Sequence, residues 1–351
     1  MFTSAFYWIL NMSLVATLVA GCLLLLRKIN KLPRRWIAAL WLLPGIRAIV
    51  PFSLGSSGGL IGLLNRLSYK LLNDTSAGTS EELLSSAGGN ILFRILPWFR
   101  EDGTGVKALS GQTLYGEIWS DLFTVNVFQQ RDWNALTETD YGQWKSLLTA
   151  QLFTIGGCIW LIVALALLLS FTVLYAITMH ELKDVQPIEG RKGVFVSGRI
   201  SSPALYGIFQ PKTVLPERMR SDEQLDLILL HEETHRKRGD NLWRILAFML
   251  IAVHWFNPLG WFCLKRVLED LELACDESVL SRLGENGRKA YATALLGEAE
   301  NKTVFAAAFG SAPLRIRIDR ILSWKRISLL SGVLLAAFFT ALAWFLLIDP
   351  A

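Results

Sequence analysis

Residues 230–240 of the chain read LHEETHRKRGD, and the interpretation of the whole sequence starts from this stretch. His231 and His235 are four residues apart, so on an α-helix both imidazoles project from one face and can bind one cation. Glu232 follows the first histidine directly and can reach a water molecule beside that cation. The H-E-x-x-H pattern is typical of the zinc helix of metallopeptidases, in which the glutamate is the general base.

The residues before the motif favour a helix that contains it. Ser221 is expected as the N-cap, acidic residues follow in the first turn, and Leu225, Ile228 and Leu229 recur at helical spacing. Further upstream, residues 193–217 read GVFVSGRISSPALYGIFQPKTVLPE, with short β-prone runs separated by Gly and Pro. This pattern predicts two or three strands ahead of the helix.

A catalytic zinc ion needs a third protein ligand, and the segment EDLELACDE at residues 269–277 offers candidates. Glu272 and Asp276 are again four apart on one helix face, so one can bind the metal while the other orients a histidine. Cys275 could bind as a thiolate, but two histidines with one carboxylate form the better hydrolytic set. Glu272 is therefore the expected third ligand.

The segment between the two motifs, WRILAFMLIAVHWFNPLGWFCLKR at residues 243–266, is nearly apolar enough to be a membrane span. A single crossing would place His231 and Glu272 on opposite sides of the membrane, where they could not share a metal. Asn257 and Pro258 interrupt the apolar run, which predicts a hairpin or broken helix that dips toward the bilayer.

Three other polar residues of this region receive plainer interpretations. His254 is expected to be a buried polar contact and not a ligand. Glu269 and Glu277 are expected to belong to a solvated acidic helix face.

The composition is that of a membrane protein, with 52% hydrophobic and 19% charged residues. Four apolar stretches are long enough to cross a hydrocarbon core of about 30 Å. They are Phe6–Leu26, Trp36–Ile61, Leu148–Ile177 and Ile327–Ile348. The short basic turn RKINKLPRR at residues 27–35 is expected inside the cell, because short cytoplasmic loops collect Lys and Arg. The N-terminus is then outside and the zinc motif is cytoplasmic.

In order along the chain, HEETHRKRGDNLWR, VHWFNPLGWF and EDLELACDE resemble the integral-membrane zinc proteases of the beta-lactam sensor-transducer and antirepressor family. The stretch SSPALYGIFQPKTVLPE resembles the region ahead of that family's zinc helix, and the match covers residues 179 to about 300. The resemblance implies a gluzincin-like site with one zinc ion. Its ligands would be His231, His235 and Glu272, with Glu232 activating water and Asp276 supporting the ligands.

The predicted fold class is a mainly α membrane protein with four transmembrane helices and a cytoplasmic α+β, gluzincin-like zinc metalloprotease domain between the third and fourth. The domains follow the topology, in the cell membrane of a bacterium. They are residues 1–66 with the first two spans and the basic turn, 67–147 as an extracytoplasmic loop, 148–178 as the third span, 179–326 as the protease domain with its membrane-associated hairpin, and 327–351 as the fourth span and a short outer tail.

The resemblance also implies a mechanism of signalling and its partners. An event outside the cell would pass through the helices, and the protease would then cut itself or a transcriptional repressor. Antibiotic receptors of the family continue into a penicillin-binding domain, whereas this sequence ends at Ala351 and has no S-x-x-K motif. Sensing by a separate protein, sensing by the outer loop and a truncated chain stay open, as does a homodimer. The lipid bilayer is the other expected partner, and no direct contact with nucleic acid is predicted.

Competing interpretations remain for the whole chain and for two segments. A non-proteolytic membrane relay or scaffold with structural zinc would not require Glu232, and a transporter would need more ionisable groups in its spans than Arg47. APLRIRIDRILSWKR at residues 312–326 is expected to be a basic amphipathic helix on anionic lipid, with a self-cleavage site as the alternative. The outer loop, 67–147, is expected to form interfacial helices or a sensing surface.

Overall fold

A computed structural model describes most of the chain outside the expected outer loop. The described residues are 2–29, 32–49, 54–55, 138–182, 185–188, 190–191, 193–200, 202–207, 211–217, 219, 224–299, 312–326 and 328–349. They form two compact units, of which one comprises Met1–Gly21, Leu43–Leu165 and Thr340–Ala351 and the other Cys22–Leu42 and Ala166–Phe339. The expectations for the outer loop up to residue 137 and for Ser221 lie outside the described residues. The HEETH motif lies in the second unit.

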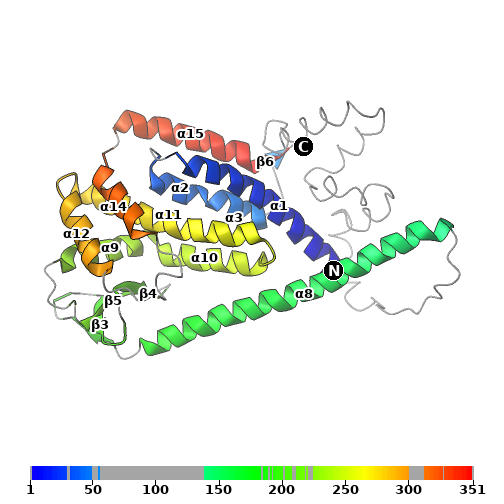
Figure 1. The fold of residues 1–351 in the computed structure, drawn as a ribbon, viewed down its shortest axis with the longest axis horizontal. Helices are drawn as coiled ribbons and strands as arrows, with labels where there is room; N and C mark the ends of the chain where they lie inside the picture. The colour runs from blue at the N-terminus through cyan, green and yellow to red at the C-terminus, as the bar shows by residue number, and fades with distance from the viewer. Residues whose placement is uncertain are drawn as a thin grey trace. The chain divides into compact units, whose positions relative to one another are not determined.

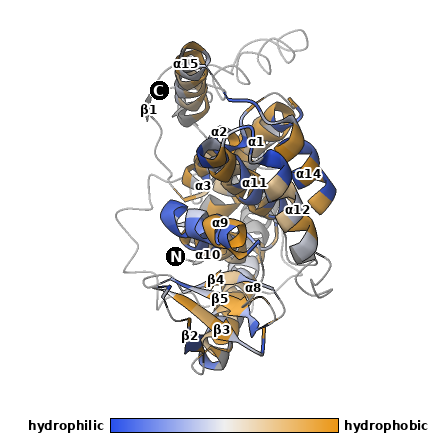
Figure 2. Cartoon of the chain, turned by 90° about the vertical axis from the view of Figure 1, so that its left-hand side faces the viewer, coloured by the Kyte–Doolittle hydropathy of each residue, from blue (hydrophilic) through white to orange (hydrophobic). Residues whose placement is uncertain are grey.

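Helices cover three of the four expected spans. They are α1 (Phe2–Arg27), α8 (Glu138–Glu181) and α15 (Leu329–Leu347) (Figure 1). Within the described residues, α8 contains an apolar stretch long enough to cross a membrane, Thr154–His180, and α1 and α15 contain shorter ones, Met12–Arg27 and Leu330–Leu346. Their apolar composition is visible in Figure 2. The described part of the chain therefore does not establish four spans.

The second expected span, Trp36–Ile61, is not one continuous helix. It divides at Trp41 into α2 (Arg34–Leu40) and α3 (Leu42–Ile49), and the two-residue strand β1 (Leu54–Gly55) follows and pairs in parallel with β6 (Ile348–Asp349). Pro44 explains the break, because a proline ring clashes with the carbonyl four residues earlier and has no N–H to donate.

The second unit contains a four-stranded sheet. Three of its strands lie in residues 193–217, which confirms the prediction of two or three strands there, and the fourth precedes that segment. The strands are β2 (Gln186–Pro187), β3 (Val194–Ser197), β4 (Ala204–Tyr206) and β5 (Lys212–Pro216), in the spatial order β2-β3-β5-β4. β3 and β5 are parallel, and the outer strands pair antiparallel to them. Val196 and Leu215 of the inner strands pack on Leu225, which anchors the sheet to the helix with the HEETH motif.

After the sheet, the described residues of this unit form five further helices. They are α9 (Leu225–Arg238), α10 (Asp240–Val253), α11 (Pro258–Leu283), α12 (Arg288–Ala299) and α14 (Leu314–Ser323). Gly239 ends α9 with a φ of 67°, a left-handed conformation that a glycine adopts without a Cβ clash, and α10 starts at the next residue. The prediction that HEETH lies on a helix is confirmed by α9.

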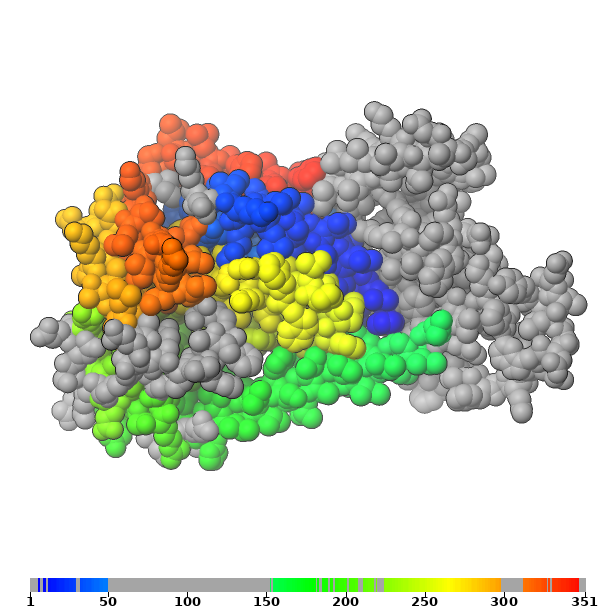
Figure 3. Space-filling model, in the orientation of Figure 1, coloured from blue at the N-terminus to red at the C-terminus, as the bar shows by residue number. Residues whose placement is uncertain are grey.

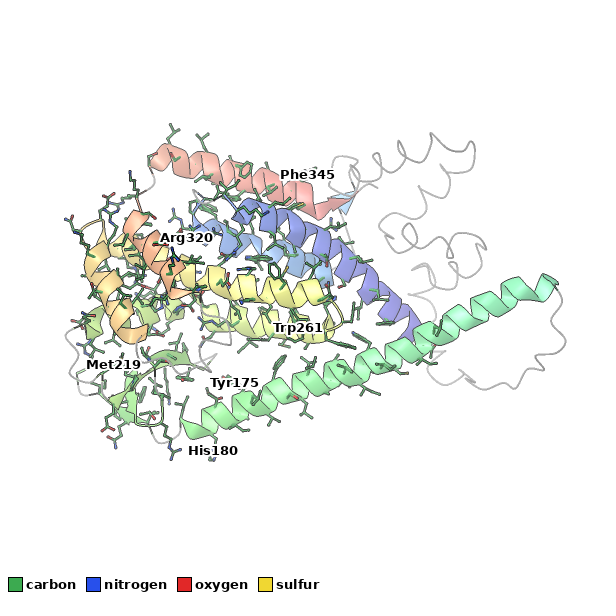
Figure 4. The ribbon with its side chains drawn as sticks, viewed as in Figure 1. Tyr175, His180, Met219, Trp261, Arg320 and Phe345 are labelled. Carbon is green, nitrogen blue, oxygen red and sulfur yellow. The ribbon has the colours of Figure 1, made fainter. Side chains whose placement is uncertain are left out.

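α10 and α11 form the expected hairpin (Figure 1). Asn257 caps α11 by accepting a hydrogen bond from the Gly260 N–H, and Pro258 occupies the first helical position, where its missing N–H costs nothing. Ile251, Leu264 and Leu268 pack between the helices. Large apolar side chains stay exposed on the outside, among them Met249, Leu259, Trp261 and Phe262, and Trp261 is labelled in Figure 4.

The main core of this unit lies among α9, α11, α12 and α14. Val279 and Leu280 of α11, Tyr291 and Leu295 of α12 and Ile321 of α14 are fully or almost fully buried there. Figure 3 shows α14 and α12 lying against each other on the face in view. This packing fixes α11 relative to α9, and these two helices carry the two sequence motifs.

Contrary to the expectation, the acidic face of α11 is not solvated. Glu269 is 2% exposed and accepts hydrogen bonds from Arg27 at 2.6 Å and Arg266 at 2.7 Å. Asp270 is fully buried and accepts from Arg27 at 3.0 Å and from the Trp41 indole at 2.9 Å. The expectation was wrong because the basic turn after α1 packs on α11, and buried carboxylates of this kind require charged or hydrogen-bonding partners.

Glu277 also has a structural role. Its carboxylate is half-buried and accepts the backbone N–H groups of Arg34 and Arg35 at 2.8 and 3.2 Å. These are the first N–H groups of α2, which no intrahelical carbonyl can satisfy. Pro33, at the N-cap position of α2, makes no side-chain capping hydrogen bond. The Glu277 carboxylate of α11 therefore caps this helix.

Candidate metal centre

The two histidines of the motif face each other inside the second unit. Successive turns of α9 carry His231 and His235, which are 4% and 3% exposed. Their Nε2 atoms are 3.1 Å apart, and the rings are nearly perpendicular, at 85°. Two imidazoles that bind one tetrahedral ion bring their nitrogens to a similar separation, because each metal–nitrogen bond is about 2.0–2.1 Å long.

The carboxylate of Glu272 approaches both histidines from α11. Its Oε2 is 3.8 Å from His231 Nε2, and its Oε1 is 3.7 Å from His235 Nε2. The structure thus brings the three residues expected as ligands to one point, although 37 positions separate the second histidine from the glutamate along the sequence.

Asp240 orients His235. Its Oδ2 accepts the Nδ1–H of His235 at 2.6 Å, and the guanidinium of Arg238 is 3.1 Å from the same carboxylate oxygen. A carboxylate on the far nitrogen fixes the tautomer and leaves Nε2 with a lone pair for a metal. Asp240 is the last residue of the stretch LHEETHRKRGD and was missed by the sequence interpretation, since only the Gly239 turn brings it back toward His235.

Tyr291 orients His231. Its hydroxyl accepts from Nδ1 at 2.8 Å and donates to Asp276 Oδ1 at 2.7 Å. Burial, followed by the charge of Asp276, raises the pKa of Tyr291 well above its usual value, so the hydroxyl keeps its proton. Asp276 was expected to support the ligands directly, but its own Oδ1 is 3.6 Å from His231 Nδ1. The tyrosine, which has no motif around it, lies between them.

Arg317 of α14 completes this network. Its Nη2 and Nε donate to the two Asp276 oxygens at 2.7 and 2.8 Å. Burial alone would lower the pKa of Arg317, but the Asp276 charge raises it well above its usual value. The guanidinium also lies 3.5 Å from Glu272 Oε2 and 3.4 Å from His231 Nε2.

Residues 312–326 were expected to form a helix on the lipid surface. α14 instead buries one side in the second unit. Arg317 is 3% exposed and Ile321 is fully buried. Arg315 is exposed on another side of the helix, and Arg320, one turn after Arg317, is partly exposed. Contact of this helix with lipid stays a prediction. Helical spacing alone does not indicate which arginine faces inward.

Arg244 connects the site to the sheet. Its Nη2 donates to Glu272 Oε1 at 2.6 Å, and its Nη1 is 3.3 Å from the Asn241 side-chain oxygen. The Asn241 amide donates in turn to the carbonyls of Leu205 and Gly207, at 2.8 and 3.1 Å. Glu272 is thus held from the side of β4 as well as from α14.

The histidine pair fits a bound cation. Each Nδ1 donates its hydrogen, to Asp240 or to Tyr291, so in the neutral rings the two Nε2 atoms direct lone pairs at each other. A proton or a metal cation between them makes this geometry favourable, and the Arg317 guanidinium, 3.4 Å from His231 Nε2, also faces one of the lone pairs. Glu272 offers an anionic oxygen on the same side: burial alone would raise its pKa, but the charges of His235, Arg244 and Arg317 lower it well below its usual value.

Cys275 offers a second possible donor set. Its Sγ forms a metal-sized cluster with His231 and His235, but it lies 3.5 Å from the Nδ1 of His231 and also contacts the carbonyl of that residue. The Glu272 oxygens, in contrast, face the Nε2 atoms of both histidines. On this geometry, two histidines and Glu272 are the donor set that we take for a metal bound at Nε2, with Cys275 as the alternative third donor.

The segment that holds these side chains also matches a known family. Residues 181–321, about two fifths of the chain, match the family described as BlaR1 peptidase M56. The matched segment contains the histidine pair, the residues that orient it and the carboxylates of α11.

Named relatives match over a shorter stretch. The regulatory protein BlaR1 of Bacillus licheniformis is 35% identical over 99 residues, which is 28% of this chain and 16% of the relative. The methicillin resistance mecR1 protein of Staphylococcus aureus is 28% identical over 103 residues, which is 28% of this chain and 18% of the relative. The chain thus matches less than a fifth of the length of either relative.

Two more residues of the matched segment were expected to be buried or catalytic. Glu232, the expected general base, is buried on α9 beside His231. His254 is buried in the turn after α10, which has 14 residues. At about 1.5 Å of rise per residue, this helix places His254 about 20 Å from Asp240, too far to join His235 in binding a metal.

Replacing Tyr291 by Phe should weaken zinc binding about 10- to 100-fold, the range for residues that orient metal ligands. The substitution keeps the buried ring but removes the hydroxyl between His231 and Asp276. Zinc affinity of the purified chain can be measured by competition with a fluorescent chelator. Unchanged affinity would mean that Asp276 can hold His231 without the tyrosine.

Proposed function

We propose that this chain is a zinc-dependent endopeptidase of the bacterial cell membrane that hydrolyses a peptide bond of a protein substrate at the cytoplasmic face. One observation carries the proposal: the Nε2 atoms of His231 and His235 and the carboxylate of Glu272 meet at one buried point. Glu232 is buried on the helix that carries both histidines. This is the residue set that peptide hydrolysis at zinc uses.

Each residue has a role in the proposed reaction. His231, His235 and Glu272 would hold one zinc ion, which supplies Lewis-acid activation of water and of the scissile carbonyl. Glu232 would accept the proton of the attacking water as general base and deliver it to the leaving amine. A glutamate is suited to both steps because it can cycle between carboxylate and acid without leaving the site.

The surrounding network supports this role by fixing the ligands. Asp240 and Tyr291 each hold one Nδ1–H, so both imidazoles keep the tautomer that a metal needs. Arg317 neutralises Asp276 and approaches Glu272, which balances two buried carboxylates with one cation. Such preorganisation keeps ligand atoms within a few tenths of an ångström of the geometry that catalysis requires.

The substrate would align along the edge of the sheet. β4 is an edge strand and contacts α9, so an extended peptide added beside it would pass the zinc helix. The Leu205 and Gly207 carbonyls already accept hydrogen bonds from Asn241, so a peptide would have to use other groups of the edge or displace this amide.

The membrane setting forms part of the same proposal. α8 provides a span, and the exposed apolar side chains of the α10–α11 hairpin would enter the cytoplasmic leaflet. The relatives are named as a regulatory protein and a methicillin resistance protein, which supports a signalling role for cleavage. We include a transcriptional repressor or the chain itself as substrate, a separate sensor protein and a homodimer in this proposal.

Metal removal tests the proposal. The full chain in proteoliposomes is incubated with cytosolic extract of the producing bacterium, and mass spectrometry quantifies new N-termini. Cleavage should stop after treatment with EDTA and return when zinc is added in excess of the chelator. Cleavage that continues in the zinc-free sample would contradict zinc-dependent hydrolysis. Signalling without any zinc-dependent cleavage would favour a non-proteolytic relay.

A further inference from the structure

Two basic segments that are distant in the sequence line one groove in the second unit. One follows α1 and includes Arg34 at the start of α2; the other is formed by α14 and the residues after it, including Arg320. The groove has a volume of about 1660 Å³, and we call it the basic groove. Eight of its lining residues are Arg or Lys and only three are Asp or Glu, so its lining is strongly cationic.

Some of these charges are already neutralised. Arg27 and Arg34 pair with Glu269 or Asp270, outside the lining, and Asp276 is held by Arg317. Arg320, in contrast, forms no hydrogen bond or ion pair with any described residue. The same is true of the side chains of four surrounding cations, Lys28, Arg35, Lys325 and Arg326. The charges of Glu277 and Asp270 act on Arg320 without a direct ion pair, and the lining keeps more positive than negative side chains.

Arg34 provides a second observation. It is 4% exposed, and among the described residues its Nε has no hydrogen-bond partner, although Nη2 donates to the Arg27 carbonyl at 3.0 Å. Burial and then the charge of Arg320 lower the pKa of Arg34 to about 10. A buried donor without a partner and two guanidinium groups that repel each other are both unfavourable. An anion in the groove would relieve both.

The rest of the lining indicates the kind of anion. Leu24 and Leu25 of α1 and Leu335 of α15 line the same groove, and Leu25 is 65% exposed. Trp324, at the end of α14, also lines it, and Trp residues favour the headgroup level of a bilayer. Figure 4 shows Arg320 on α14. The lining thus combines positive side chains with leucines, which are the two kinds of group that a phospholipid contacts.

We propose that the basic groove binds an anionic phospholipid, with its phosphate at Arg320 and Arg34 and its acyl chains along Leu24, Leu25 and Leu335. This inference does not depend on peptidase activity. A free phosphate ion would use only the cationic part, and an acidic peptide would leave the leucines of α1 and α15 uncovered.

The lipid site adjoins the candidate metal centre. Asp276 lines the groove, and Arg317, which holds Asp276, is one helical turn before Arg320 on α14. A phosphate bound at Arg320 would hold α14 against α11, and with it the contact between Arg317 and Asp276. The bound lipid is therefore expected to raise the thermal stability of the second unit.

Lipid binding by the full chain in detergent tests the proposal. Phosphatidylglycerol and phosphatidylcholine with the same acyl chains are titrated separately, and binding is followed by native mass spectrometry and by the melting temperature. Phosphatidylglycerol should bind more tightly and raise the melting temperature further. Arg320→Gln should weaken phosphatidylglycerol binding about fivefold, the effect of roughly one cation near a lipid surface. Equal binding of the two lipids would overturn the proposal.

Matched variants separate this site from general attraction. Arg315→Gln removes a cation from the exposed face of the same helix, outside the groove, and should change binding less than twofold. Arg320→Lys should retain most of the affinity, which controls for misfolding. If Arg315→Gln and Arg320→Gln have equal effects, the groove is not the site. If glycerol phosphate or an acidic peptide stabilises the chain as much as the lipid does, a phospholipid is not its specific occupant.

Discussion

Glu232→Gln should reduce peptide cleavage by about three orders of magnitude while zinc binding stays unchanged. General acid–base catalysis contributes about 10²- to 10⁴-fold, and glutamine has the shape of glutamate but cannot take up a proton. The side chain is buried beside His231 yet is not one of the expected ligands, so its replacement should leave the metal in place. Cleavage is measured as the rate at which new N-termini appear, and zinc by elemental analysis of the same samples.

The neighbouring residue supplies a control for this variant. Glu233 carries the same side chain one position further along α9, but it lies toward the surface and pairs with Arg236 and Lys237. Glu233→Gln should change cleavage less than twofold, because exposed ion pairs contribute little. If Glu232→Gln cleaves at the native rate, another residue is the base, and if it loses zinc, the glutamate is a ligand.

The local part of the site was predictable from the sequence, because helix periodicity alone determines it. His231 and His235 are four apart, and any α-helix places them on one face. Asn257 and Pro258 likewise predicted the hairpin, since proline is tolerated in the first turn of a helix but disrupts a helix interior. In each case, interactions within a few residues determine the outcome.

The missing part of the site depends on packing between distant segments. Tyr291 and Arg317 reach His231 from α12 and α14, and no periodicity distinguishes Arg317 from Arg315 or Arg320 on the same helix. Burial was also misjudged at Glu269, because an acidic face appears solvated until an oppositely charged segment packs on it. The charge of residues 27–35 led to the prediction that this turn lies inside the cell, which stays a prediction, but it did not predict the ion pairs of the turn with α11.

From the sequence, the third zinc ligand beside the two histidines can be Glu272 or Cys275. Glu272 and Cys275 are three residues apart on α11, and both approach the histidine pair. The carboxylate lies on the side where the two Nε2 atoms meet, whereas the sulfur contacts the Nδ1 and the backbone carbonyl of His231. The carboxylate faces the Nε2 atoms of both histidines, whereas the sulfur also interacts with the His235 side chain and is the alternative third donor.

Removing a residue that orients a metal ligand weakens metal binding roughly 10- to 100-fold. Glu272→Gln removes a ligand and should therefore weaken zinc binding by more than this. Cys275→Ala should change zinc binding only a few-fold. Glu272→Asp, which keeps a carboxylate, should recover part of the affinity and shows that the loss is not due to misfolding. Competition with a fluorescent chelator measures all three variants on the full chain. The opposite order, with zinc lost from Cys275→Ala and kept by Glu272→Gln, would make the site a thiolate centre. Such a centre would not have the two-histidine, one-carboxylate ligand set on which the proposed peptidase depends.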